Sequence, residues 1–218
     1  MLEQQLKKVV KLTSHTQRNW DVSVPFPQPH TKRIVDFAIS IPTKNGINYF
    51  DLICVTDNTI KRELYDCTLG YTIAGGKEHK NSQILAPLVL VWVNRFQKAL
   101  GSNNEARGKT DEFYQEEHSL MRKVQNDYHF LSEQLVSMHV GISSAYANIM
   151  AGSIGYKTGF CKCFSNHEKM MHTLGIDKRV ELMLGIGEAN ETLQSTEHHD
   201  ETFEYGTVLK EPIKIINL

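Results

Sequence analysis

The sequence predicts an α+β fold in which a sheet is covered by helices. Apolar runs with β-branched residues occupy residues 49–55, 84–94 and 180–187, and each run is typical of a buried strand. Helical spacing of apolar residues occurs before and between these runs, most clearly over residues 131–155. The order of these elements favours one sheet with helices packed against it.

The N-terminal half contains two helices before the first strand. Residues 2–12 carry apolar side chains at helical spacing, and a proline-rich turn follows them. Thr31 is the predicted N-cap of a second helix, which we expect to end before Pro42. After the first strand, Asp57 or Asn58 caps a short helix that runs to about Cys67.

A long helix is predicted at residues 131–155, and it is apolar on two sides. One apolar stripe contains Leu135, Met138, Ile142, Ala145 and Ile149, and the other contains Val136, Val140, Ala147 and Ala151. Such a helix belongs at the centre of the fold or at a subunit interface. A charged surface helix is expected at 111–128, and a short helix that ends at Gly175 is expected after the long one. Residues 207–218 form an expected extended tail.

Composition and charge exclude several classes of function. The chain has 218 residues, of which 40% are hydrophobic and 22% charged, and these values are typical of a globular protein. We expect one domain covering residues 1–218. Twenty-four Lys and Arg residues against 25 Asp and Glu residues give a net charge of −1, without a basic stripe. Nucleic acid is therefore not an expected partner.

The sequence also lacks the patterns of secretion and of membrane insertion. The N-terminal segment has no uninterrupted apolar core, and polar residues interrupt the apolar run at 135–154. Four cysteines without a secretory signal favour free thiols in a reducing compartment. We therefore expect a cytoplasmic protein with no membrane partner.

Four segments, taken in order, resemble one known family. They are TQRNWD (16–21), IPTKNGINYFDLICVTD (41–57), NSQILAPLVLVWVN (81–94), and the stretch from SSAYANIMAGS (143–153) through GYKTGFCKCF (155–164) to LGIDKRVELMLGIGE (174–188). In order and spacing they resemble the FMN-dependent nitroreductase family, over most of the chain. The resemblance implies a nitroreductase-like mixed sheet covered by helices, a long central helix, and an extended C-terminal tail exchanged in a homodimer.

The resemblance also implies a cofactor and an activity. It implies an FMN-dependent oxidoreductase that passes electrons from NAD(P)H to a small, electron-poor organic substrate by a ping-pong mechanism. In that family the FMN sites lie at the dimer interface. Because the flavin carries the chemistry, no catalytic acid or base is assigned to a side chain.

Two predicted groups of cofactor-binding residues lie in the N-terminal part of the chain. Arg18 offers a guanidinium and Asn19 an amide to a phosphate, and Trp20 either packs against the cofactor or lies in the core. The loop TKNGIN offers polar groups to the edge of the isoalloxazine ring or to the ribityl hydroxyls. Its predicted binding residues are Thr43, Lys44, Asn45 and Asn48.

The remaining predicted contacts come from the C-terminal part. By register with the turn of the family, Cys161, Lys162 and Cys163 place backbone N–H groups next to flavin N5. Lys210 stands at the position of a phosphate-contacting cation in the tail. No metal site is predicted, because Cys-x-Cys is short for a zinc knuckle, and a disulfide between these two cysteines would be strained.

The chain departs from the family pattern at several positions. Asn19 and Trp20 replace an Arg and a Ser, Gly46 and Asn48 alter the loop, and Lys162–Cys163 replace a Gly-Gly pair. Three alternatives therefore stay open. They are a family member with other chemistry, such as a flavin-destroying oxygenase or a reductive dehalogenase; a flavin-binding protein without turnover; and a thiol or zinc redox sensor. The aromatic residues Phe113, Tyr114 and Tyr128 are possible neighbours of the open face of the flavin.

Overall fold

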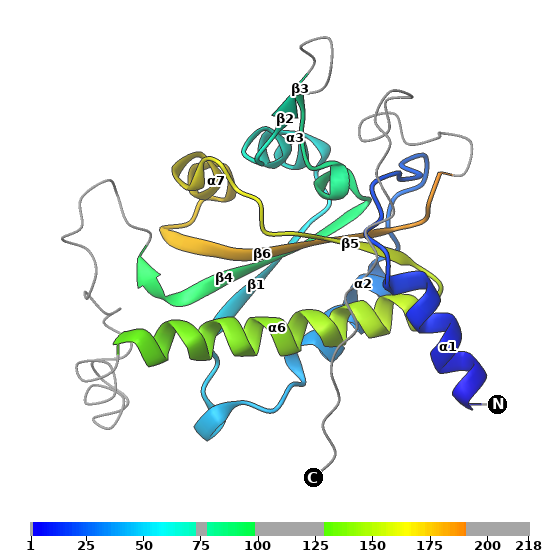
Figure 1. Cartoon of the computed structure of the whole chain (residues 1–218), viewed down its shortest axis with the longest axis horizontal. Helices are drawn as coiled ribbons and strands as arrows, with labels where there is room; N and C mark the ends of the chain where they lie inside the picture. Colours follow the sequence, from blue (N-terminus) through cyan, green and yellow to red (C-terminus); the bar gives the residue numbers. More distant parts are fainter. Residues whose placement is uncertain (1, 73–77, 99–128, 191–218) are drawn as a thin grey trace.

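A four-stranded sheet forms the centre of the computed structural model, which describes residues 2–72, 78–98 and 129–190 (Figure 1). The strand order is β1 (Phe50–Val55), β4 (Leu88–Lys98), β6 (Lys178–Gly187) and β5 (Lys157–Cys161). Each neighbouring pair is antiparallel. The predicted α+β fold is confirmed, and β1 and β5 are the edges of this sheet. The predicted helix at 111–128 and the C-terminal tail lie outside the described residues.

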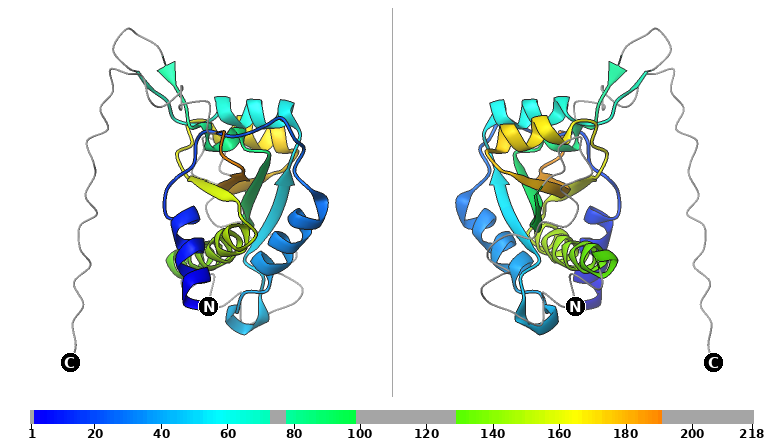
Figure 2. Two further views of the ribbon diagram at one scale, coloured as in Figure 1. Left: turned by 90° about the vertical axis from the view of Figure 1, so that its right-hand side faces the viewer. Right: turned by 90° about the vertical axis from the view of Figure 1, so that its left-hand side faces the viewer.

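Helices cover both faces of the sheet (Figure 2). On one face α6 (His129–Ser153) crosses the strands, between α1 (Leu2–Thr13) and α2 (Gln28–Ile39). The opposite face carries α3 (Asn58–Asp66), α7 (His167–Leu174) and the 3₁₀ turn η2 (Ser82–Leu85). A second 3₁₀ turn, η1 (Lys44–Gly46), precedes β1, and the short strands β2 (Tyr71–Thr72) and β3 (Glu78–His79) form a separate pair.

Strand β4 is buried on both faces, as its continuous apolar sequence predicts. Side chains alternate along a strand, so each face of β4 faces a different helix layer. Leu88, Leu90 and Trp92 pack in the cluster beneath α6. Val89, Val91 and Val93 pack in the opposite cluster with residues of α3 and α7. The two clusters form one core on each side of the sheet.

Local sequence signals set two of the helix ends. The Asp57 carboxylate accepts hydrogen bonds from the amides of Thr59 and Ile60 at 2.7 and 3.0 Å, and it thereby caps α3 as predicted. Gly175 ends α7 in the left-handed conformation with φ 65°, also as predicted. These two boundaries depend on residues within one helical turn of the end.

Two predicted boundaries are wrong, both next to prolines. Thr31 is not the N-cap of α2, because the helix begins at Gln28 and Pro27 precedes it with φ −66°. The amide of Thr31 donates to the Pro27 carbonyl at 3.0 Å, inside the first turn. The predicted strand at 84–94 begins only at Leu88, because the chain forms η2 before Pro87.

Helix α6 has one buried side and one exposed side. Val136, Val140, Ala147 and Ala151 are 0–4% exposed. On the other stripe Met138 and Ile149 are 47% and 45% exposed. No helix in the described ranges combines the length and the hydropathy that crossing a bilayer requires. Met138 and Ile149 therefore expose apolar surface that has no partner in the described part of the chain, whereas Leu135 of the same stripe packs against the core.

Three glycines form a bare patch on the sheet face that carries η2, and we call it the glycine patch. A Cβ at Gly185 would lie 1.9 Å from the Gln83 carbonyl oxygen, and one at Gly159 would lie 2.3 Å from the Gln17 carbonyl oxygen. A Cβ at Gly187 would lie 2.5 Å from Pro87. Only glycine permits this close approach of the backbone. The patch brings the N-terminal segment and η2 onto strands β5 and β6.

Candidate functional site

The N-terminal segment 17–20 crosses the sheet at the end of β6. Trp20 pairs with Ala189 in an isolated antiparallel bridge. The Asn190 amide donates to the Asn19 carbonyl at 3.2 Å, and the Asn19 side chain donates to the Asn190 carbonyl at 3.1 Å. These contacts hold the segment by its backbone, and they use the Asn19 amide group that the sequence offered to a phosphate.

The Trp20 side chain anchors this segment in the core. It is 5% exposed, and its indole N–H donates to the Ser82 carbonyl at 2.9 Å. Its ring belongs to the core cluster on the η2 side of the sheet. Of the two roles considered for Trp20, the structure places it in the core, beneath the residues that face outward.

Arg18 carries a buried donor that nothing in the described chain satisfies. Its Nε is buried without a hydrogen-bond partner among these residues. The Ser82 hydroxyl donates to the Arg18 carbonyl at 3.1 Å, which fixes the backbone at this position. Buried donors are nearly always paired in proteins, so an unpaired one requires an explanation.

Cys161 lies beside Arg18 at the end of β5. The thiol is 2% exposed, and burial raises its pKa to about 11, although the charge of Arg18 acts in the opposite direction. Cys161 is therefore a protonated, buried thiol rather than a nucleophile. Lys162 and Cys163 are exposed, and the Cys163 carbonyl accepts from the Leu69 amide at 2.9 Å.

The outer edge of β5 presents main-chain groups to this corner. The Thr158 carbonyl accepts from the Gln17 amide at 2.8 Å, and the Phe160 carbonyl accepts from Gln83 Nε2 at 3.3 Å. Main-chain groups two residues apart point the same way along a strand. The next such position is Lys162, where the backbone leaves the strand. That backbone groups at residues 161–163, rather than sulfur, face a ligand stays a prediction.

Gln83 is the residue that sequence reasoning missed. It is 4% exposed, and its Oε1 is buried without a partner in the described part of the molecule. No signal marks it, because a glutamine within NSQILAP is an ordinary loop residue until the fold brings it against β5. We call Arg18, Ser82, Gln83, Cys161 and Lys162 together the β5 corner.

The predicted loop contacts lie elsewhere. The Lys44 amide donates to His139 Nε2 at 3.1 Å, and His139 Nδ1 donates to the Leu135 carbonyl at 2.7 Å. The rings of Tyr49 and His139 stack with centroids 4.3 Å apart. His139 is 1% exposed and holds the loop against α6 as a neutral imidazole with its proton on Nδ1.

Within one chain the predicted residues thus form two separate groups. The loop precedes Phe50, which pairs with Asn94 at one end of the sheet, while Trp20 pairs with Ala189 beyond the other end. Thr43 is half-buried, and Lys44 and Asn48 are exposed. The Asn45 side chain and Lys210 lie outside what the structure describes. Arg18, Asn19 and Trp20 come together with Cys161–Cys163; the loop does not join them.

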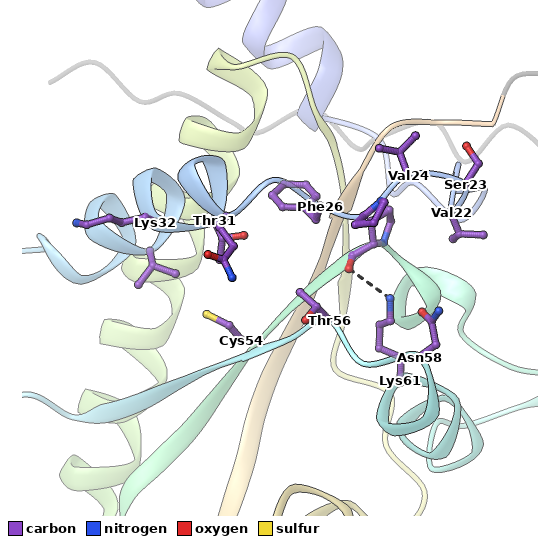
Figure 3. Close-up of a pocket in the computed structure, with 14 residues that line it drawn as sticks. Val22, Ser23, Val24, Phe26, Thr31, Lys32, Cys54, Thr56, Asn58 and Lys61 are labelled. Atoms are coloured by element: carbon purple, nitrogen blue, oxygen red, sulfur yellow. Dashed lines mark hydrogen bonds between the residues drawn. The ribbon is translucent and has the colours of Figure 1, made fainter.

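A cavity of about 830 Å³ lies between α2 and the outer edge of β1 (Figure 3). None of the predicted cofactor residues lines it. Its buried cation, Lys61, is 3% exposed and donates to the carbonyls of Ala86 and Pro87 at 2.8 and 3.2 Å. Desolvation lowers the pKa of Lys61. This lysine ties α3 to the start of β4, so its contacts are those of a structural residue.

The donor set of the β5 corner fits part of a flavin mononucleotide. A guanidinium suits a phosphate, and main-chain groups at a strand end suit the polar edge of a ring. Arg18 Nε and Gln83 Oε1, which have no partner among the described residues, are a donor and an acceptor that a hydroxylated chain would satisfy. In the described ranges, no group of three or more His, Cys, Asp or Glu side chains is placed to hold a metal ion.

The fold matches solved structures of nitroreductases. A nitroreductase family protein from Streptococcus pneumoniae TIGR4 has a TM-score of 0.63 and 14% identity, over 93% of this chain and 98% of that chain. One from Clostridium novyi NT has a TM-score of 0.59 and 15% identity, over 86% of each chain. A nitroreductase-type protein from Exiguobacterium sibiricum 255-15, in complex with FMN, has a TM-score of 0.58 and 15% identity, over 84% of this chain and 88% of that chain.

These likenesses define the class of fold. The chain has the fold of nitroreductase-family oxidoreductases, and the resemblance seen in the sequence is confirmed at that level. Neither a family model nor a curated protein matches the sequence. At 14–15% identity to these three structures, residue roles have to be argued from the chain itself.

Proposed function

We propose that this protein is an FMN-dependent oxidoreductase of the nitroreductase type, which takes electrons from NAD(P)H and passes them to an electron-poor organic substrate by a ping-pong mechanism. The observation that carries the proposal is the β5 corner. There a half-buried arginine whose Nε is buried, a buried amide and the end of an edge strand meet, in a fold that holds FMN in the Exiguobacterium protein.

The roles of the residues follow from their positions. Arg18 would hold the phosphate, and the main chain at residues 161–163 would orient the ring. When bound, FMN supplies the hydride and electron transfer. The burial of Cys161, which raises the pKa of its thiol, keeps a reactive thiolate away from the ring. Trp20 and the glycine patch hold these groups against the sheet.

A homodimer is part of the proposal. Residues 134–153 of α6 contain no Asp, Glu, Lys or Arg, and Met138 and Ile149 are exposed on that helix. On α1, Leu2, Leu6 and Val10 are 69%, 52% and 61% exposed. Apolar helix faces of this kind are typical of obligate interfaces. We propose that a second copy of the chain covers them.

The dimer also explains why the predicted contacts separate within one chain. The loop at 43–48 lies at the far end of the sheet from Trp20, so we propose that it completes the site of the partner subunit. The tail with Lys210 would likewise reach the partner. There the outer edge of β1, which pairs with no strand among the described residues, and the cavity beside it would receive an extended segment.

The experiment is a titration of the purified apo-protein with FMN, followed by anaerobic addition of NADH or NADPH. We expect stoichiometric binding, a yellow protein, and bleaching of the flavin bands by at least one nicotinamide. Light scattering should give the mass of a dimer. A protein that binds no FMN at micromolar concentration contradicts the proposal.

A second function is favoured by one observation. Lys162 and Cys163 replace the Gly-Gly pair at the turn expected to face the ring, and both side chains are exposed there. Bulk at this position favours a flavin-binding protein without turnover, or a family member with different chemistry. Flavin that is bleached by dithionite but by neither nicotinamide would support this second function.

A further inference from the structure

We propose that Gln83 recognises the ribityl chain of the cofactor, its Oε1 accepting a hydrogen bond from a ribityl hydroxyl. The inference rests on the proposed function and adds a residue to the same site. The Gln83 carboxamide oxygen is buried and has no hydrogen-bond partner in the described residues.

The orientation of the Gln83 amide follows from its neighbours. Its nitrogen lies 3.3 Å from the Phe160 carbonyl oxygen and 3.4 Å from Asn81 Oδ1. Both of those atoms are acceptors, since Asn81 uses its own nitrogen to donate to the Leu69 carbonyl at 2.9 Å. The amide nitrogen must therefore face them, and Oε1 faces elsewhere. Within the described part of the chain, no group donates a hydrogen bond to Gln83 Oε1.

Packing holds the side chain in this place. A Cβ at Gly159 would lie 3.0 Å from Gln83 Cγ and 3.3 Å from Gln83 Cβ, and one at Gly185 would lie 1.9 Å from the Gln83 carbonyl oxygen. The residue thus lies directly on the glycine patch. An amide that is 4% exposed and confined in this way cannot turn to water without disturbing η2. The missing donor has to come to it.

The neighbouring segment offers the complementary atom. Arg18 Nε is a buried donor without a partner in the described chain, and the Ser82 hydroxyl joins the Arg18 backbone to η2 at 3.1 Å. A hydroxyl both accepts and donates, so it satisfies an unpaired donor and an unpaired acceptor together. A phosphate only accepts. In FMN the phosphate is attached to the last carbon of the ribityl chain, and the neighbouring carbons carry hydroxyl groups. A phosphate held by Arg18 would therefore place ribityl hydroxyls nearby.

The test compares three flavins that differ in their side chains: FMN, riboflavin, and lumiflavin, which has neither ribityl chain nor phosphate. Binding to apo-protein is measured by quenching of flavin fluorescence, for the wild type, Gln83→Met and the control Gln28→Met. Gln28 is an exposed glutamine outside the β5 corner. Methionine keeps the length of the side chain and removes both polar atoms.

We expect Gln83→Met to weaken FMN and riboflavin alike, by about tenfold, and to leave lumiflavin unchanged. Gln28→Met should change none of the three. Equal loss for all three flavins would show a general effect on the site and overturn the inference. Unchanged binding of FMN and riboflavin would overturn it too, and would assign the Gln83 oxygen to a buried water.

A second measurement does not depend on the variant folding. Riboflavin analogues that lack each ribityl hydroxyl in turn are titrated into the wild-type protein. We expect one analogue to bind about tenfold more weakly, and that analogue should lose nothing further against Gln83→Met. Equal binding of all analogues overturns the inference while leaving the proposed function intact. Failure of the wild type to bind FMN at all is the separate outcome that removes the proposed function.

Discussion

The β5 corner and the loop around η1 are both polar, but they differ in how their hydrogen bonds are completed. At the loop, His139 uses both ring nitrogens within the chain and stacks on Tyr49. At the β5 corner, Arg18 Nε and Gln83 Oε1 are buried with no partner in the described residues. A polar group that is satisfied internally contributes to stability, whereas one left unsatisfied costs stability until a ligand arrives. The two regions should therefore respond in opposite ways to mutation.

The largest effect is expected where the β5 corner depends on the glycine patch. Gly185→Ala places a Cβ 1.9 Å from the Gln83 carbonyl oxygen, so the backbone of η2 or of β6 would have to shift. We expect a loss of about 3 kcal/mol or more in the free energy of unfolding, measured by urea denaturation. The control is Gly141→Ala, where an added Cβ meets nothing within 4 Å. An unchanged midpoint for Gly185→Ala would mean that η2 does not lie on the patch.

The pH dependence of the β5 corner gives the next effect. In the unfolded chain the Cys161 thiol loses its proton near 9.0, and in the folded chain near 11, because burial raises its pKa. Between these values the folded state binds more protons, so its stability falls as the pH rises. The stability that the wild type has over Cys161→Ala should shrink by about 2 kcal/mol between about pH 8 and about pH 11. An equal difference at both pH values would place the thiol in water.

A substitution at Arg18 should change FMN binding without lowering the stability of the apo-protein. We expect Arg18→Met to weaken FMN binding by about 2 kcal/mol, as measured by fluorescence titration, because a charge-assisted contact is lost. The free energy of unfolding of the apo-protein should not fall, since the variant removes a buried donor without a partner in the described chain. Arg33→Met, at an exposed position on α2, is the matched control and should change neither quantity. A destabilised Arg18→Met with normal FMN affinity would reverse the roles assigned to the two regions.

His139 should behave in the opposite way. His139→Phe keeps a ring to stack on Tyr49 but removes the acceptor for the Lys44 amide and the donor to Leu135. We expect a loss of about 1–2 kcal/mol in the free energy of unfolding of the apo-protein, measured by denaturant titration. If the loop completes the site of the partner subunit, FMN binding also weakens, because the variant releases the loop in both subunits of the dimer. Normal stability for this variant would remove the contrast between the regions.

Much of the fold could be predicted because its signals are local. The apolar run of β4, the Asp57 cap and the left-handed Gly175 each act over a few residues, and the structure confirms all three. The errors at Thr31 and at residues 84–87 occur where a proline changes the backbone next to a good pattern. The sequence pattern predicted the right type of element at both places, but the neighbouring proline set the residue at which the element begins.

The candidate site was less predictable, since its contacts join distant parts of the chain. Arg18 and Cys161 are adjacent only because the glycine patch admits the segment around Gln17 and η2 to β5. Trp20 reads equally well as a ligand contact or a core residue until its N–H is found on the Ser82 carbonyl. Gln83 shows no periodicity, cap or motif that distinguishes it from a surface loop residue.

The sequence by itself determined which segments become strands and helices, because periodicity, caps and glycine conformations are properties of neighbouring residues. The order of four sequence segments also carried the resemblance to the nitroreductase family. The tertiary structure alone decided that Arg18 lies against Ser82 and Gln83 against β5, while the loop at 43–48 lies at the other end of the sheet. The physical reason is that burial and unmet hydrogen bonds arise from long-range packing. The glycine patch, made of residues that are far from Gln83 in the sequence, creates both.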